Sequence, residues 1–218
     1  MEKADFLLVG VGGQGIVTSS DILADVGLRA GYDVKKSEVH GMAQRGGAVT
    51  SHVRLGRRVH APLISQGQAD FLVAFELLEA LRWAHYLHPQ GIALVNIQSL
   101  PPLAVTSGQA RYPEMDQIRE ELARRARQVH FVEGIRTAQE LGNVRVTGTV
   151  LLGALSALLP IPPALWEEAL AEHVPARYLE LNRQAFWAGR GLLGAQLCPQ
   201  DAAEEGAGRA GGYREVAL

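Results

Sequence analysis

The chain has 218 residues, of which 47% are hydrophobic and 20% are charged, as is typical of a globular protein with one large domain. A chain of this length buries about 70% of the surface that its unfolded form exposes, so it needs neither a disulfide framework nor a structural metal. Its formal net charge of −2 gives no reason to expect a nucleic acid or an anionic membrane as a partner.

Buried strands and helices alternate along the amino-terminal half of the chain. Residues 6–9 form a continuous apolar run that ends in glycines, which is typical of a buried parallel strand. Apolar residues then recur at helical spacing and predict a helix over about residues 14–30. Alternating runs at residues 32–36 and 48–55 predict two further strands, and residues 56–58 suit a hairpin turn after the second of them.

The alternation continues to residue 132. The patterns predict strands at residues 69–75, 91–97 and 129–132, helices at about residues 76–87 and 115–126, and an irregular proline-containing segment at residues 100–113. Strands and helices in this order predict an α/β fold with a mainly parallel, Rossmann-like sheet and helices on both faces.

From about residue 147 the pattern changes to helices only, so the fold should end in a helical region. We interpret residues 1–198 as one α/β domain that includes this helical part. Residues 199–218 contain hardly any large apolar side chain and are expected to form a disordered tail.

Nothing in the sequence predicts a targeting or membrane-spanning segment. The first residues lack the shape of a signal peptide, and the most apolar run, residues 150–159, is shorter than the roughly 20 residues that cross a bilayer. The single cysteine, Cys198, can neither form an internal disulfide nor hold an iron–sulfur cluster alone. We therefore expect a cytoplasmic protein with no membrane or nucleic-acid partner.

The first informative motif is Gly10-Val11-Gly12-Gly13-Gln14-Gly15, which fits G-x-G-x-x-G between a predicted strand and a predicted helix. Glycines let the backbone turn tightly and approach a phosphate, while the start of the helix offers free N–H groups and the positive end of a dipole. The motif therefore predicts phosphate or pyrophosphate binding. Its candidate cofactor-binding residues are Gly10, Gly12, Gly13, Gln14 and Gly15. Alternatively, the glycines serve only the close packing of strand and helix.

The second motif is Ser-Glu-Val-His-Gly-Met-Ala-Gln-Arg-Gly-Gly at residues 37–47. It follows the second predicted strand, so its loop should emerge at the same edge of the sheet as the first glycine turn. The candidate cofactor-binding residues here are Glu38, His40, Gln44, Arg45, Gly46 and Gly47. A guanidinium offers paired donors to phosphate or carboxylate, and the glycines let backbone N–H groups approach a ligand.

Each polar residue of this second motif also has a purely structural interpretation. Arg45 could form a surface salt bridge, which contributes little by itself. His40 could be a buried hydrogen-bonding histidine, Glu38 could cap a turn, and Gln44 could tie the loop to its neighbour. The sequence assigns no catalytic residue and no metal ligand.

Residues 7–54 resemble the gamma subunit or gamma domain of 2-oxoacid:ferredoxin oxidoreductases, and the wording that carries the resemblance, VGVGGQGIVTSSDILADVGLRAGYDVKKSEVHGMAQRGGAVTSHVRLG, occupies residues 9–56. Within that family, the wording of the second motif is similar to the beta subunit of the indolepyruvate type. A weaker similarity continues through residues 141–143 and 150–155. Family members often have Asn where this chain has Gly148, so no site is assigned there.

The resemblance implies a division of labour between subunits. A large (alpha) subunit carries thiamine diphosphate with magnesium and the iron–sulfur clusters, and it decarboxylates the 2-oxoacid. The acyl group passes to coenzyme A, and the electrons leave through the clusters to ferredoxin. The present chain would be the small subunit without clusters, inactive alone.

For the small subunit itself, the resemblance and the two motifs suggest that both glycine loops face a shared active site. Coenzyme A is the leading ligand, because its pyrophosphate suits the amino terminus of a helix. Gly12, Gly13 and Gly15 would let the ligand come close to the backbone, and the guanidinium of Arg45 would offer it paired, positively charged donors. Three alternatives stay open: loops that only brace the interface with the large subunit, a free-standing NAD- or FAD-dependent enzyme, and a scaffold subunit without a ligand of its own.

Overall fold

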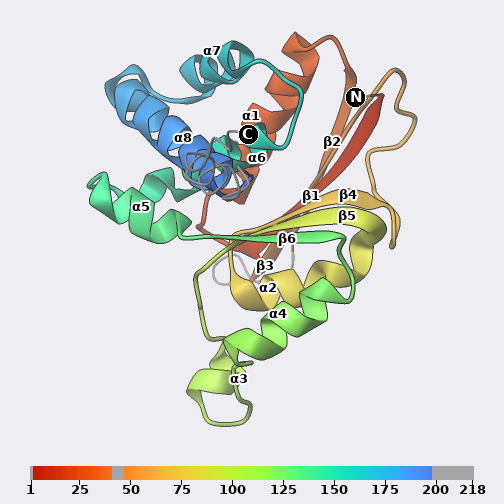
Figure 1. Ribbon diagram of the computed structural model, residues 1–218, viewed down its shortest axis with the longest axis vertical. Coiled ribbons are helices and arrows are strands. Elements are labelled where there is room, and N and C mark those ends of the chain that lie inside the picture. Colours follow the sequence, from red (N-terminus) through yellow and green to blue (C-terminus); the bar gives the residue numbers. More distant parts are fainter. Residues whose placement is uncertain (1, 41–46, 198–218) are drawn as a thin grey trace, which may run out of the picture.

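A six-stranded sheet in the order β2-β3-β1-β4-β5-β6 forms the centre of the computed structural model, which describes residues 2–40 and 47–197 (Figure 1). The strands are β1 (Lys3–Val11), β2 (Asp33–His40), β3 (Ala48–Gly56), β4 (Ala69–Ala74), β5 (Leu87–Asn96) and β6 (Gln128–Val132). The helices are α1 (Ile16–Arg29), α2 (Leu77–Trp83), α3 (Leu103–Thr106), α4 (Met115–Ala123), α5 (Gly134–Glu140), α6 (Thr147–Ala157), α7 (Pro163–His173) and α8 (Ala176–Leu197), with short 3₁₀ turns η1 (Ala84–Tyr86) and η2 (Val144–Val146). The tail expected at residues 199–218 lies outside the described residues.

The prediction of a mainly parallel sheet is confirmed, with one antiparallel strand inside it. Strands β1, β4, β5 and β6 pair in parallel, whereas β3 pairs antiparallel with both β1 and β2. Strand β2 consequently runs in the same direction as β1. The reason is the short connection between β2 and β3, since a parallel neighbour needs a crossover of a dozen or more residues.

The hairpin expected after residue 55 does not form. Strand β3 ends at Gly56 and the chain leaves the sheet, with the Val59 N–H donating to Asp33 Oδ2 at 2.7 Å. The hairpin partner of β3 is therefore the strand before it, β2, and not the segment after it. The sequence also missed α5, and the proline-containing segment includes the short helix α3.

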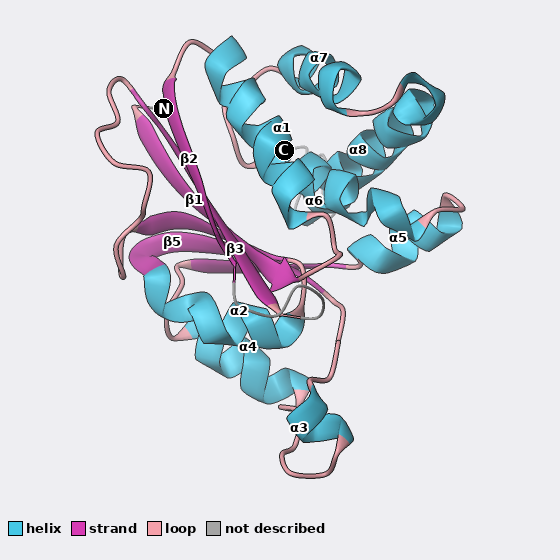
Figure 2. Ribbon diagram, turned by 180° about the vertical axis from the view of Figure 1, so that it is seen from behind, coloured by secondary structure: helices cyan, strands magenta, loops and turns pink. Residues whose placement is uncertain are grey.

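Helices cover both faces of the sheet, as Figure 2 shows from behind. Phe6 and Leu8 of β1 point into a core shared with α1, α6, α7 and α8, whereas Leu7 and Val9 point into a core shared with α2 and α4. All four side chains are fully buried, which explains the unbroken apolar run that predicted this strand. Within the described residues, no helix combines the length and the apolar character needed to span a bilayer.

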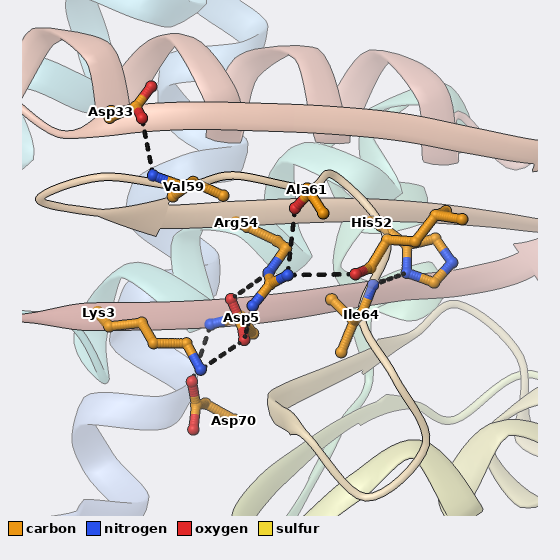
Figure 3. A network of polar contacts seen from close by, with 10 residues as sticks. Lys3, Asp5, Asp33, His52, Arg54, Val59, Ala61, Ile64 and Asp70 are labelled. Atoms are coloured by element: carbon orange, nitrogen blue, oxygen red, sulfur yellow. Dashed lines mark hydrogen bonds and ion pairs between the residues drawn. The ribbon is translucent and has the colours of Figure 1, made fainter.

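A buried ion pair lies at the amino-terminal end of β1 (Figure 3). The guanidinium of Arg54 donates to both carboxylate oxygens of Asp5, at 2.9 and 3.0 Å, and Lys3 Nζ lies 2.8 Å from Asp5 Oδ2. Arg54 also donates to the carbonyl oxygens of Ala61 and Leu63, at 3.1 and 3.2 Å. One side chain thus joins β3 to β1 and fixes the loop that follows β3.

His52, the neighbour of this network, makes stability depend on pH. Its Nδ1 accepts the N–H of Ile64 at 3.2 Å, and burial together with the nearby Arg54 lowers the pKa of His52 below 6.5. The unfolded chain therefore binds a proton at His52 before the folded chain does, so the stability conferred by neutral His52 is complete above pH 6.5 and is lost as the pH falls below it. We expect the free energy of unfolding of the wild type, measured with urea, to decrease between pH 7 and 5.5, with His52 contributing up to about 1.4 kcal/mol per pH unit. In His52→Gln this dependence on pH should be weaker. An unchanged slope in the variant would contradict the assignment.

Candidate functional site

The first glycine turn joins β1 to α1 and needs glycine at three places. Gly13 and Gly15 have φ angles of 102° and 84°, a region that other residues rarely adopt. A Cβ on Gly10 would lie 2.8 Å from Gln14 Oε1 and 2.9 Å from the Cβ of Phe75. Helix α1 begins at Ile16, and no side chain of the described residues caps it, so the start of this helix favours an acceptor or a negative charge.

The second motif returns to this turn. The Gly12 N–H donates to the Gly47 carbonyl oxygen at 2.9 Å, so the two motifs meet at the carboxyl edge of β1. Gln44, Arg45 and Gly46 lie outside the described residues, and His40 is placed only as the last residue of β2. The structure therefore brings Gly47 to the predicted site.

Glu38 forms an ion pair within the fold. Its Oε1 lies 2.6 Å from Lys36 Nζ, and Lys36 also bonds to Asp21 of α1. Burial alone would lower the pKa of Lys36, but the hydrogen-bonded carboxylates of Asp21 and Glu38 outweigh burial and raise it above its usual value. Glu38 thus helps to join β2 to α1.

A cavity of about 380 Å³ opens beside the first turn. Four segments that are distant in the sequence line it: Gly13, Gln14 and Gly15; Gln98; Ile135; and Val144, Arg145 and Thr147. The sequence predicted only the first of these segments. Two weak signals pointed to others, namely an Asn-Ile-Gln run at the end of a buried strand and the patch of family similarity at residues 141–143.

Gln14 braces the turn from within. Its Oε1 accepts the Val11 N–H at 2.7 Å, and its Nε2 donates to the carbonyl of Phe75 and to Gln98 Oε1, each at 3.0 Å. Gln14 therefore ties the ends of β1, β4 and β5 together at the floor of the cavity.

Asn96 extends this network to α5. It is fully buried, and its Nδ2 donates to the Phe75 carbonyl at 3.0 Å and to Gln98 Oε1 at 3.2 Å. Its Oδ1 accepts the Ile135 N–H at 3.3 Å. The ends of β1, β4 and β5 and the start of α5 are thus held together by side-chain amides and not by the backbone ladder alone.

Glu76 fixes the loop that leaves β5. Its carboxylate caps α2 by accepting the Glu79 N–H at 2.9 Å, accepts the Leu100 N–H at 2.9 Å and binds the hydroxyl of Tyr112. Burial and the hydrogen bond to Glu76 raise the pKa of Tyr112 far above its usual value. The loop carrying Gln98 is therefore anchored at two points, which keeps this wall of the cavity in place.

The lining of the cavity suits binding better than acid–base chemistry. The cavity is lined by the backbone of Gly13 and Gly15 just before α1, by the amide of Gln98 and by the guanidinium of Arg145, while Ile135 and Val144 are its apolar residues. Among the described residues that line the cavity, Arg145 alone is ionisable, and its guanidinium offers fixed donors and no acceptor. The arrangement favours a ligand that carries an anionic, acceptor-rich group next to an apolar part. Among the described residues, no cluster of His, Cys, Asp and Glu could hold a metal ion.

Known proteins match this chain over most of its length. The chain is 40% identical over 189 residues to the indolepyruvate oxidoreductase subunit IorB of Archaeoglobus fulgidus, which covers 86% of this chain and 94% of the relative. It is 36% identical over 192 residues to IorB of Thermococcus kodakarensis, with 87% of this chain and 95% of the relative covered.

Solved structures share the fold. The gamma subunit of a keto/oxoacid ferredoxin oxidoreductase from Geobacter sulfurreducens matches with a TM-score of 0.67 at 25% identity, over 88% of this chain and 99% of that one. A 2-oxoglutarate:ferredoxin oxidoreductase from Magnetococcus marinus, which has coenzyme A bound, matches with a TM-score of 0.69 over 89% of this chain and 32% of that one. At 23% identity this second likeness concerns the fold alone. The family model described as pyruvate ferredoxin/flavodoxin oxidoreductase matches residues 5–192, so the chain belongs to that family.

Proposed function

We propose that this chain is the small subunit of an indolepyruvate-type 2-oxoacid:ferredoxin oxidoreductase. The observation that carries the proposal is 40% identity to an IorB subunit over almost the full length of both chains. IorB subunits from three further archaea are 34–36% identical over 84–87% of this chain. More distant relatives, at 25–26% identity, are common gamma subunits of pyruvate/ketoisovalerate oxidoreductases.

The chemistry of the reaction belongs to a large (alpha) subunit in this proposal. The whole sequence has one cysteine, and iron–sulfur clusters are held by several cysteine thiolates, so such a cluster does not fit this chain alone. The large subunit would decarboxylate an aryl pyruvate on thiamine diphosphate and pass the electrons through its clusters to ferredoxin. We place the complex in the cytoplasm.

The role of the small subunit is to hold coenzyme A by its pyrophosphate in the cavity beside the first glycine turn. The donors that line the cavity fit an anion, and Arg145 adds a positive charge to them. Coenzyme A, when bound, supplies the thiol that accepts the acyl group. Gly13 and Gly15 leave room for its phosphates, and Ile135 and Val144 offer apolar contact to its organic part.

A second candidate role is a brace for the interface, with no ligand of its own. The hydrogen bonds of Gln14 favour it, because both ends of that amide are used inside the fold. In this case the glycine turns serve packing, and coenzyme A is bound by the partner.

Reconstitution with a large subunit tests both roles. The complex should reduce a dye with indolepyruvate only when coenzyme A is present, and this chain alone should be inactive. Arg145→Ala should raise the KM for coenzyme A about tenfold or more with assembly intact, since a hydrogen bond to a charged group contributes about 1.5–3 kcal/mol. Arg45→Ala is a parallel variant in the second motif.

The outcomes separate the two roles. If the Arg145→Ala or Arg45→Ala variant fails to assemble with the large subunit while the chemistry is otherwise normal, the result would favour the role as an interface brace. Turnover by the isolated chain, or an assembled complex without any 2-oxoacid-dependent activity, would contradict the proposed function.

A further inference from the structure

Backbone groups fix the orientation of the Gln14 amide. The Val11 N–H needs an acceptor and finds Gln14 Oε1 at 2.7 Å, so the other end of this amide must be its NH₂ group. The same NH₂ group lies 3.0 Å from the Phe75 carbonyl, which can only accept. Two independent backbone contacts therefore agree that Gln14 presents a donor to Gln98.

The amide of Asn96 is fixed in the same way. Its Oδ1 accepts the N–H of Ile135 at 3.3 Å, and its Nδ2 donates to the Phe75 carbonyl at 3.0 Å. Asn96 is fully buried, so solvent water cannot replace either of these hydrogen-bond partners. Asn96 consequently presents a second donor to Gln98.

Both donors meet the same atom of Gln98. Gln14 Nε2 lies 3.0 Å and Asn96 Nδ2 lies 3.2 Å from Gln98 Oε1. Rotating the Gln98 amide by 180° would set three NH₂ groups against one another, so the observed orientation is enforced. The NH₂ group of Gln98 must then point away from the network, and within the described part of the chain it has no acceptor.

Gln98 lines the cavity beside the glycine turn together with Arg145, and its Oε1 contacts Gln14 of that turn. We propose that Gln98 is a specificity-determining residue of this site, whose fixed NH₂ group donates to an anionic oxygen of the ligand, a phosphate or a carboxylate. The inference rests on the proposed function, in which that oxygen belongs to the pyrophosphate of coenzyme A. A neutral donor locked in this orientation selects acceptor oxygens and disfavours ligand groups that are themselves donors.

Gln98→Glu is the sharpest test, because the two side chains have nearly the same shape. One carboxylate oxygen still accepts from Gln14 and Asn96, so the network and the fold are kept. The other oxygen places a negative acceptor where the wild type has a donor. In the reconstituted complex we expect the KM for coenzyme A to rise at least about tenfold and kcat to stay within about twofold, and inhibition by inorganic pyrophosphate to weaken in parallel.

The pH dependence separates a ligand contact from a merely structural role. Protonation of the new carboxyl restores a donor, so the KM of Gln98→Glu should approach the wild-type value as the pH is lowered. Gln90→Glu is the matched control, because it makes the same charge change at an exposed position at the other end of β5. Its KM should equal that of the wild type. If Gln98→Glu does not assemble, Gln98→Met, which keeps the length but has no donor, should raise the KM about threefold to tenfold.

An assembled Gln98→Glu complex, or failing that a Gln98→Met complex, with wild-type KM and wild-type inhibition by pyrophosphate overturns the inference while leaving the proposed function intact. A wild-type complex that shows no dependence on coenzyme A overturns the proposed function. In that event, calorimetric titration of the wild-type and Gln98→Glu complexes with pyrophosphate decides about Gln98: weaker binding to the variant supports its role, and equal binding or none to either complex refutes it.

Discussion

Arg54→Met is expected to lower the free energy of unfolding by about 3 kcal/mol, because it leaves the carboxylate of Asp5 buried without its main partner. The Asp5 side chain is only 1% exposed, and Arg54 donates two hydrogen bonds to it. Lys3 remains within 2.8 Å of Asp5, but its side chain is half exposed, so it compensates only in part. The variant also frees the carbonyl groups of Ala61 and Leu63. Chemical denaturation of the purified chain at pH 7 measures the loss.

Arg57→Met is the matched control for that variant. Arg57 also pairs with a carboxylate, Glu2, at 2.8 Å, but both side chains are 84% exposed. An exposed pair contributes at most about 1 kcal/mol, and salt screens it. If the two variants lost the same stability, burial of Asp5 would not be the cause. The double variant Asp5→Asn, Arg54→Met should recover part of the loss, since it no longer buries an unpaired charge.

Gly189→Ala is expected to destabilise the chain by about 3 kcal/mol, the upper end of the cost of overpacking. Helices α6 and α8 cross so closely that a Cβ on Gly189 would lie 1.9 Å from the Val150 carbonyl oxygen. On the facing helix, a Cβ on Gly153 would lie 2.0 Å from the Phe186 carbonyl oxygen. The clash is with backbone on both sides, so no side-chain rotation can relieve it, and the helices must move apart. Thermal unfolding of the purified chain should show the change as a lower Tm.

Gly191→Ala, two residues further along the same helix, is its control. A Cβ there meets nothing within 4 Å. Replacing glycine by alanine inside a helix stabilises by about 0.8–1 kcal/mol, so this variant should melt at a higher temperature than the wild type. A lower Tm in both variants would mean that α8 is sensitive to any substitution, and that close packing at Gly189 is not the reason.

The sequence determined all six strands, the longer helices and the glycine turn of this protein, but not α3 or α5. An apolar run such as residues 6–9 indicates a strand that is buried on both faces. The G-x-G-x-x-G motif between a strand and a helix indicates a turn that only glycine makes easily. Both patterns can be recognised in the sequence because they involve residues that are neighbours in the chain. The sequence also predicted that the two motifs meet, since strands that run in the same direction end at the same edge of the sheet. The hydrogen bond from Gly12 to Gly47 confirms that they meet there. The antiparallel position of β3 did not follow, because an alternating run does not say which neighbour it pairs with.

Only the tertiary structure decided what faces the turn. Gln14 and Gln98 are 84 residues apart in the chain, and Arg145 lies beyond a further strand and three helices, yet the three line one cavity. The Asn-Ile-Gln run that ends in Gln98 is only a weak signal along the chain, and it does not say how the amide of Gln98 is oriented. Its role arises from the folded state, because two amides fixed by backbone contacts dictate how the third is oriented. Hydrogen bonds between distant segments exist only once the sheet has placed those segments side by side, which is why the sequence could supply the turn but not the residues that complete its site.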